Sequence, residues 1–233
     1  IWDAMARNTF GGDLLAAHAD VESIFPAQFD ADANAYDTVF YTPLYTPRTA
    51  IPALDAYLAT GNRRIVTHSF LPYSLDRGVN YFSWDEPAHQ VAHHALDNLQ
   101  GADRWLLSPV FSSLQYVPGE VSGMVRFGDR ELGTAAVPEY WQWQPAGAEV
   151  LATIGDKPLI SRVRDDAGNE FIYWHVRLSR LEPKLRRAAV RQMVETLALP
   201  TLAQVHPEAP ALLHSFRSEA MPDARAVVLY SRD

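Results

Sequence analysis

Short apolar runs rich in β-branched and aromatic residues alternate along the chain with segments whose apolar residues recur at helical spacing. Residues 36–41 and 63–68 are strand-like and apolar enough for buried parallel strands. Between them, residues 49–60 place apolar side chains on one helical face, and Gly61 follows as a natural helix end. The pattern predicts a strand–helix–strand unit, long enough for a right-handed crossover between parallel strands.

The second half of the chain shows antiparallel patterns. Residues 119–133 alternate around Gly128-Asp129, which predicts a hairpin. Three further strand-like runs are separated by turns rich in Gly, Asp and Asn, and they predict an antiparallel meander. These runs are residues 148–154, 159–163 and 171–176.

Helical spacing marks three other segments. Residues 1–19 are expected to be helical with an interruption at Gly11-Gly12, and residues 85–99 and 182–197 are expected to form uninterrupted helices. Additional strand-like runs are found at residues 21–25, 211–216 and 224–230. Together the elements predict an α/β fold: a flavodoxin-like open, mostly parallel sheet with helices on both faces, plus an antiparallel β extension.

Composition and charge exclude several functions. The 233-residue chain carries a formal charge of -8, which argues against nucleic acid as a partner because such binding neutralises phosphates. It has no apolar run of about 18 residues, so no membrane span is expected. It has no cysteine, which removes disulfides and thiolate chemistry. We expect a soluble protein; the compartment stays open, with the cytoplasm favoured.

Two stretches carry a resemblance to a known family. The first is AYDTVFYTPLY at residues 35–45, followed by ALDAYLATG at residues 53–61. The second is YWQW at residues 140–143, then GAEVLAT at residues 147–153, continuing to the FIY of residues 171–173. The chain resembles the class-I glutamine-amidotransferase-like domain of multidomain β-galactosidases, often called the trimerisation domain. The matching motifs are structural rather than catalytic.

The resemblance implies two domains. Residues 1–203 would form the amidotransferase-like α/β domain, and residues 204–233 a C-terminal β-hairpin or the start of a small β-domain. The family's first strand should precede Trp2, and nothing precedes Ile1. Either the chain is cut after that strand, which we favour, or residues 225–231 fill its place.

The resemblance also implies a function. It suggests a non-catalytic structural or oligomerisation domain of a β-galactosidase-like hydrolase, with no catalytic residue and no cofactor of its own. Its partners would be a catalytic barrel in the same or a partner chain, further copies of itself, and carbohydrate.

The sequence itself contains only incomplete catalytic and metal-binding motifs. An amidotransferase needs a cysteine, and the serine elbow of a hydrolase needs flanking glycines, which Thr67-His68-Ser69-Phe70 lacks. His89 and His93, one helical turn apart, form a weak candidate for a metal site, without the glutamate of a His-Glu-x-x-His motif.

Aromatic residues are candidates for stacking on sugar rings. They are Tyr45, Trp84, Trp141 and Trp143, for which packing in a core or interface is the favoured alternative. Because open α/β sheets bind ligands beyond the carboxyl ends of their strands, Tyr45, His68 and Ser69 are the expected cleft residues.

Two alternative functions follow. The chain could be a free-standing carbohydrate-active hydrolase that uses His68 with a nearby carboxylate. The available carboxylates are Asp85, Glu86, Glu120, Asp129, Glu131 and Glu139, but the chain is too short for a full catalytic barrel of about 250 residues. It could instead be a carbohydrate-binding module built on Trp141 and Trp143.

Overall fold

A computed structural model describes residues 10–17, 19, 36–41, 51–68, 73–75, 104–106, 108–201, 211–218 and 221–231. The chain divides into two compact units, which are described separately below. One unit combines Ile1–Ser23 with Leu181–Asp233, and the other is Ile24–Arg180. None of the helices among the described residues is long and apolar enough to cross a membrane.

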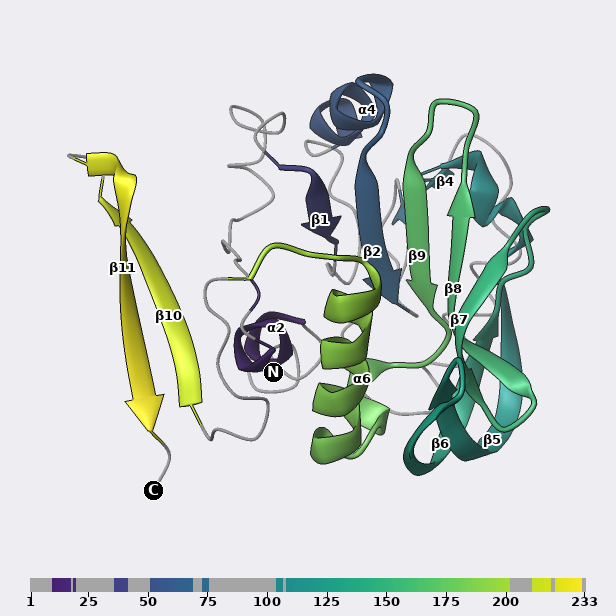
Figure 1. Cartoon of the computed structure of the whole chain (residues 1–233). Coiled ribbons are helices and arrows are strands. Elements are labelled where there is room, and N and C mark those ends of the chain that lie inside the picture. Colours follow the sequence, from purple (N-terminus) through teal and green to yellow (C-terminus); the bar gives the residue numbers. More distant parts are fainter. Residues whose placement is uncertain are drawn as a thin grey trace. The chain divides into compact units, whose positions relative to one another are not determined.

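The unit Ile24–Arg180 is built on one seven-stranded sheet (Figure 1). In sheet order its strands are β1 (Thr38–Phe40), β2 (Arg64–His68), β9 (Glu170–Trp174), β8 (Lys157–Arg164), β7 (Glu149–Ile154), β5 (Gln115–Phe127) and β6 (Arg130–Gln142). β1, β2 and β9 are parallel neighbours, whereas the pairs from β9 to β6 are antiparallel. The open mixed sheet confirms the predicted α/β class.

The predicted strand–helix–strand unit is present as β1, α4 (Ile51–Ala59) and β2. Gly61 follows α4 with φ at +72°, and a Cβ there would lie 2.8 Å from the carbonyl oxygen of Ala167. A side chain is therefore excluded twice, by backbone conformation and by space. Tyr57 is fully buried, and its hydroxyl donates to the carbonyl oxygens of Asp37 and Arg64, both at 3.2 Å. α4 is thus tied to the amino ends of β1 and β2.

The hydrophobic core of this unit joins α4 to the sheet. The 3-10 helix η5 (Pro109–Ser113) contributes Phe111, which stacks on Trp143 at 5.1 Å between ring centroids and meets Phe171 edge-on at 5.7 Å. Large aromatic groups dominate core energetics because each buries much apolar surface. The buried members of the cluster are Tyr41, Ala53, Leu54, Tyr57, Ile65, Phe111, Leu114, Trp141, Trp143, Val163, Phe171 and Tyr173.

The predicted hairpin is longer than its sequence pattern indicated. β5 and β6 each contain 13 residues, joined by a Gly128-Asp129 turn in which Gly128 has φ at +53°, as in a type II′ turn. β5 contains Pro118 and Gly119, which are typical of loops, but register shifts there let the ladder continue past them. At its far end β6 meets the residue after β9: the backbone N–H of Trp141 donates to the carbonyl of His175 at 2.8 Å.

The meander of β7, β8 and β9 agrees with the prediction, and so does the two-residue turn at Gly155-Asp156. The same unit contains the short antiparallel pair β3 (Tyr73–Leu75) and β4 (Arg104–Leu106), and the 3-10 helix η6 (Leu178–Arg180). The parallel strands and the meander form one sheet because β9 pairs with β2 on one side and β8 on the other.

The other unit contains α2 (Gly11–Ala16) and α6 (Pro183–Thr196). A nearly buried ion pair joins them, with Arg186 Nε 2.5 Å from Asp13 Oδ2. α6 begins after Glu182, whose carboxylate accepts from the N–H of Leu185 at 3.0 Å and caps the helix. α6 confirms the predicted long helix. α2 begins at the glycine pair where the interruption was expected, and residues 1–9 of the expected helix lie outside the described residues.

The C-terminal strands β10 (Ala211–Ser218) and β11 (Met221–Ser231) pair with each other as an antiparallel hairpin in a sheet of their own. The predicted domain boundary at residues 203 and 204 stays a prediction. The expected strand at residues 21–25 and the expected helix at residues 85–99 lie outside the described residues.

Candidate functional site

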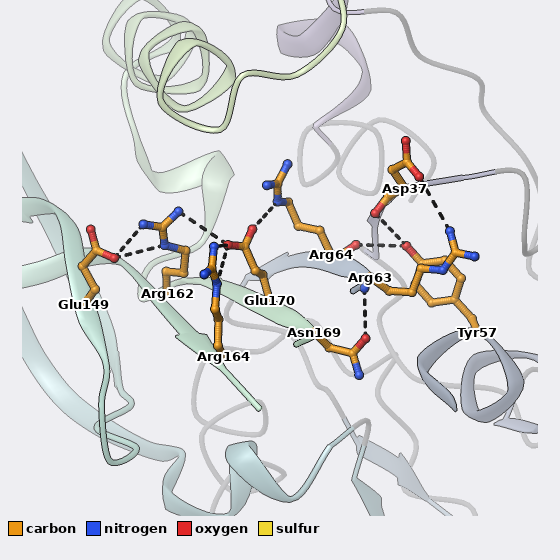
Figure 2. Close-up of polar contacts among 9 residues, drawn as sticks. All are labelled: Asp37, Tyr57, Arg63, Arg64, Glu149, Arg162, Arg164, Asn169 and Glu170. Atoms are coloured by element: carbon orange, nitrogen blue, oxygen red, sulfur yellow. Dashed lines mark hydrogen bonds and ion pairs between the residues drawn. The ribbon is translucent and has the colours of Figure 1, made fainter. Parts of the chain in front are cut away.

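A row of alternating charges crosses four neighbouring strands near the amino ends of β2 and β9 (Figure 2). Glu170 opens β9, and the strand register places it directly between Arg64 of β2 and Arg164 of β8. Arg64 Nε lies 2.7 Å from Glu170 Oε2, and Arg164 reaches Oε1 through Nε at 2.9 Å and Nη2 at 2.5 Å. Farther along the row, Arg162 binds Glu149 through Nε at 3.1 Å and Nη2 at 2.7 Å.

Glu170 is the electrostatic centre of this row. Its side chain is 7% exposed, and burial alone raises its pKa. The hydrogen bonds from Arg164 and Arg64 outweigh the effect of burial and hold the pKa of Glu170 below its ordinary value. Arg162 adds a longer contact at 3.7 Å. Glu170 is therefore ionised at neutral pH and fixes the surrounding guanidinium groups.

Arg63 approaches the same region from the side of α4. Its Nε donates to Thr60 Oγ1 at 2.6 Å, its Nη1 donates to the carbonyl of Tyr36 at 3.1 Å, and its guanidinium lies 5.3 Å from the ring centroid of Tyr57. Asp37 makes only a long contact with Arg63, at 3.7 Å, and its side chain is fully exposed. Burial raises the pKa of Tyr57 to about 12, so its ring stays neutral beneath the cation.

Asn169 joins the turn after α4 to the turn before β9. It is 2% exposed, and its Oδ1 accepts from the backbone N–H of Arg63 at 3.0 Å. Its Nδ2 donates to the carbonyl of Leu58 at 3.1 Å and to Asp165 Oδ2 at 3.0 Å. Two turns more than 100 residues apart in sequence are thus held in contact, which fixes the position of Arg63 relative to Glu170.

Some of these residues line a groove of about 340 Å³. Three arginines face two carboxylates in it, so the lining carries an excess of positive charge although the whole chain is acidic. Its lining residues are Asp37, Asn62, Arg63, Arg64, Arg164, Gly168 and Glu170. The sequence analysis missed this groove, and it lies at the opposite edge of the parallel strands from the expected cleft.

The expected cleft residues at the carboxyl ends of the strands are only partly described. His68 ends β2, as predicted, but it is 1% exposed and therefore offers no ring nitrogen to a substrate in solution. Tyr45 and Ser69 lie outside the described residues, as do Trp84, His89 and His93. Within the described residues no group of histidines and carboxylates is placed to hold a metal ion.

Trp141 and Trp143 belong to the core. They are 4% and 1% exposed, and Trp143 Nε1 donates to the carbonyl of Val110 at 2.8 Å. Neither ring presents a face on which a sugar could stack, so the structure shows the packing alternative. Among the candidate carboxylates, Glu139 is buried against Arg177 at 2.6 Å, and Glu131 pairs on the surface with Arg126.

Ser161 and His175 form a buried pair that the sequence analysis also missed. Ser161 Oγ lies 2.8 Å from His175 Nε2, and His175 Nδ1 lies 2.7 Å from the carbonyl oxygen of Trp141. Burial lowers the pKa of His175 to about 4, so the ring is neutral, and Nδ1 must carry the proton because a carbonyl only accepts. The contacts are those of a serine and its base. With exposures of 1% and 0%, no substrate reaches them.

Comparison with known proteins gives structural likeness only. No protein-family model and no curated protein matches the chain. A catalytic mutant of Gan42B, a GH42 β-galactosidase from G. stearothermophilus, matches with a TM-score of 0.54 and 14% identity, over 89% of this chain and 28% of that one. At this identity the match shows a shared fold.

Two further solved structures match with lower TM-scores. The cold-adapted β-galactosidase from Rahnella sp. R3 has a TM-score of 0.47 and 16% identity, over 87% of this chain and 28% of that one. The cytoplasmic protein STM1381 from Salmonella typhimurium LT2 has a TM-score of 0.47 and 12% identity, over 79% and 85%. The chain therefore spans just over a quarter of the length of the two β-galactosidases.

Proposed function

We propose that this chain is a structural domain of a β-galactosidase-type glycoside hydrolase, of the amidotransferase-like class, and has no turnover of its own. The observation that carries the proposal is the coverage of the fold match. The likeness to a GH42 β-galactosidase includes 89% of this chain but 28% of that enzyme, which is what a single domain of a larger hydrolase would give. The domain would pack against a catalytic barrel in the same or a partner chain and contribute to an oligomer.

The chemistry of the chain supports a non-catalytic role. It has no cysteine, so the nucleophile of an amidotransferase is missing. Three described residues that could act as base or nucleophile are used inside the fold: His68, Ser161 and His175 are each at most 1% exposed. Glu139 is held by Arg177 in a nearly buried ion pair. A general acid or base must reach the proton that it transfers, and these groups do not.

The proposal is tested by assaying the full 233-residue chain on p-nitrophenyl β-D-galactopyranoside, beside a GH42 β-galactosidase under the same conditions. We expect release of nitrophenol at the rate of buffer alone, and saturable release from the enzyme. Saturable hydrolysis by the chain would contradict the proposal and favour a free-standing hydrolase. In that case His68→Ala would show whether the activity depends on the end of β2.

A further inference from the structure

An arginine-lined groove lies at the amino ends of β1, β2 and β9. Its arginines are fixed in place and one of them has a donor left free among the described residues, which are features of a binding site. We propose that it binds a small organic acid through one carboxylate, with Arg164 as the main contact. The inference rests on the groove itself and does not depend on the proposed function.

The arginines are held in place before any ligand arrives. Glu170 fixes Arg164 through Nε and Nη2, and it fixes Arg64 through Nε. Thr60 and the carbonyl of Tyr36 fix Arg63. Binding sites gain affinity when supporting contacts fix their side chains in advance, because less side-chain freedom is lost on binding.

Arg164 has a donor to offer. Glu170 engages Nε and Nη2, whereas Nη1 has no hydrogen-bond partner within the part of the chain that the structure describes. The side chain is 68% exposed although its orientation is fixed, so its outer edge is open to a solute. A planar guanidinium matches the planar geometry of a carboxylate, and such charge-assisted hydrogen bonds are stronger than neutral ones.

The size and charge of the groove narrow the ligand class. A volume of about 340 Å³ lies at the lower end of the range for small-molecule sites. The exposed carboxylate of Asp37 lies in the lining, close to the arginines. It would repel a dianion such as phosphate more than the single charge of one carboxylate group. Two of the groove arginines, Arg64 and Arg164, already bind the carboxylate of Glu170, which shows that their geometry suits this group.

The experiment is a titration of the full chain with propionate, which carries a single carboxylate, followed by amide and arginine Nε–H NMR signals at constant ionic strength. We expect saturable shifts at Gly168 and Arg164, and a dissociation constant at least about tenfold weaker for Arg164→Ala, since one charge-assisted contact is worth roughly that factor. The matched control is Arg126→Ala, which removes another exposed arginine, paired with Glu131 and outside the groove. It should leave binding unchanged.

A second variant should change the affinity in the opposite direction. Asp37→Asn removes the repelling carboxylate from a fully exposed position, so it should fold normally and bind propionate more tightly, by a few-fold. Three results would overturn the proposal: no saturable shift with the native chain, equal binding by the native chain and Arg164→Ala, or tighter binding of inorganic phosphate than of propionate. The last would assign the groove to phosphate.

Discussion

His175 shows how one buried residue depends on its protonation state. In the neutral ring Nδ1–H donates to Trp141 and Nε2 accepts from Ser161, so both nitrogens are satisfied without any charge in the core. A protonated ring would place a second N–H against the Ser161 oxygen and a positive charge in a site with 0% exposure. Burying an unpaired charge is unfavourable, so the native state resists protonation.

The stability of the chain should therefore fall with acid. The pKa of His175 is lowered from 6.5 to about 4, so between these values the unfolded state binds a proton that the native state does not. The free energy of unfolding should fall by about 3 kcal/mol as the pH drops from about 6.5 to 4, measured by urea unfolding. His175→Gln removes the titrating ring and should show a flatter dependence. If the free energy of unfolding depended on pH equally in the native chain and in His175→Gln, the acid sensitivity would not come from His175.

Asn169 is the second residue whose loss should be costly. In Asn169→Ala the N–H of Arg63 and the carbonyl of Leu58 lose their side-chain partner in a nearly buried site. We expect a loss of about 2 to 3 kcal/mol in the free energy of unfolding, because buried polar groups are left unsatisfied. Gln144→Ala removes an exposed side-chain hydrogen bond, from Gln142, and should change stability by at most about 0.5 kcal/mol. Equal losses would show that the two turns do not depend on Asn169.

At the level of elements, two turn glycines differ in why a side chain is unfavourable: at one the reason is backbone conformation alone, and at the other it is also close packing. Gly128 and Gly155 both occupy turns with positive φ, at 53° and 59°. A Cβ at Gly128 would meet nothing within 4 Å, whereas one at Gly155 would lie 2.8 Å from the carbonyl oxygen of Ser122. The first turn is open to solvent, and the second lies against β5, where Gly155 N–H donates to the carbonyl of Met124.

This difference predicts that alanine at the two positions lowers the free energy of unfolding by unequal amounts. Gly128→Ala should lower the free energy of unfolding by about 1 kcal/mol, the cost of left-handed backbone for alanine. Gly155→Ala should cost about 2 to 4 kcal/mol, because a steric overlap with β5 adds to the same backbone term. Thermal and urea unfolding of both variants measures the gap. Similar losses would mean that β5 and β7 adjust to the new methyl group easily.

Most elements could be predicted from local pattern because their apolar periodicity and their turns are local properties. β2, α4, β8, β9 and α6 follow such patterns within one or two residues. The full length of β5 could not be predicted from local pattern, since Pro118 and Gly119 indicate a loop. The strand continues past these residues because it pairs with β6. α2 begins at Gly11, within the expected interruption, and local pattern does not indicate a helix start there because glycine has a low helix propensity.

At the scale of the whole molecule, the proposed function predicts a larger parent protein. The native protein, captured with an antibody against this domain and measured by intact-mass spectrometry, should have a mass well above 26.1 kDa or co-purify with a second, catalytic chain. The physical reason is that the GH42 enzyme sharing this fold is more than three times as long as the matched part. A captured species of 26.1 kDa alone that hydrolyses galactosides would contradict the proposal.

The sequence by itself determined the strand–helix–strand unit, the meander, the α/β class and the lack of a cysteine nucleophile, because each depends on local periodicity or composition. Only the tertiary structure decided the candidate site. Arg64 and Glu170 are 106 residues apart, and no local pattern connects them. The pairing of β2 with β9 brings them to adjacent positions. The same packing places Trp141 and Trp143 in the core, since burial depends on which elements meet around a side chain.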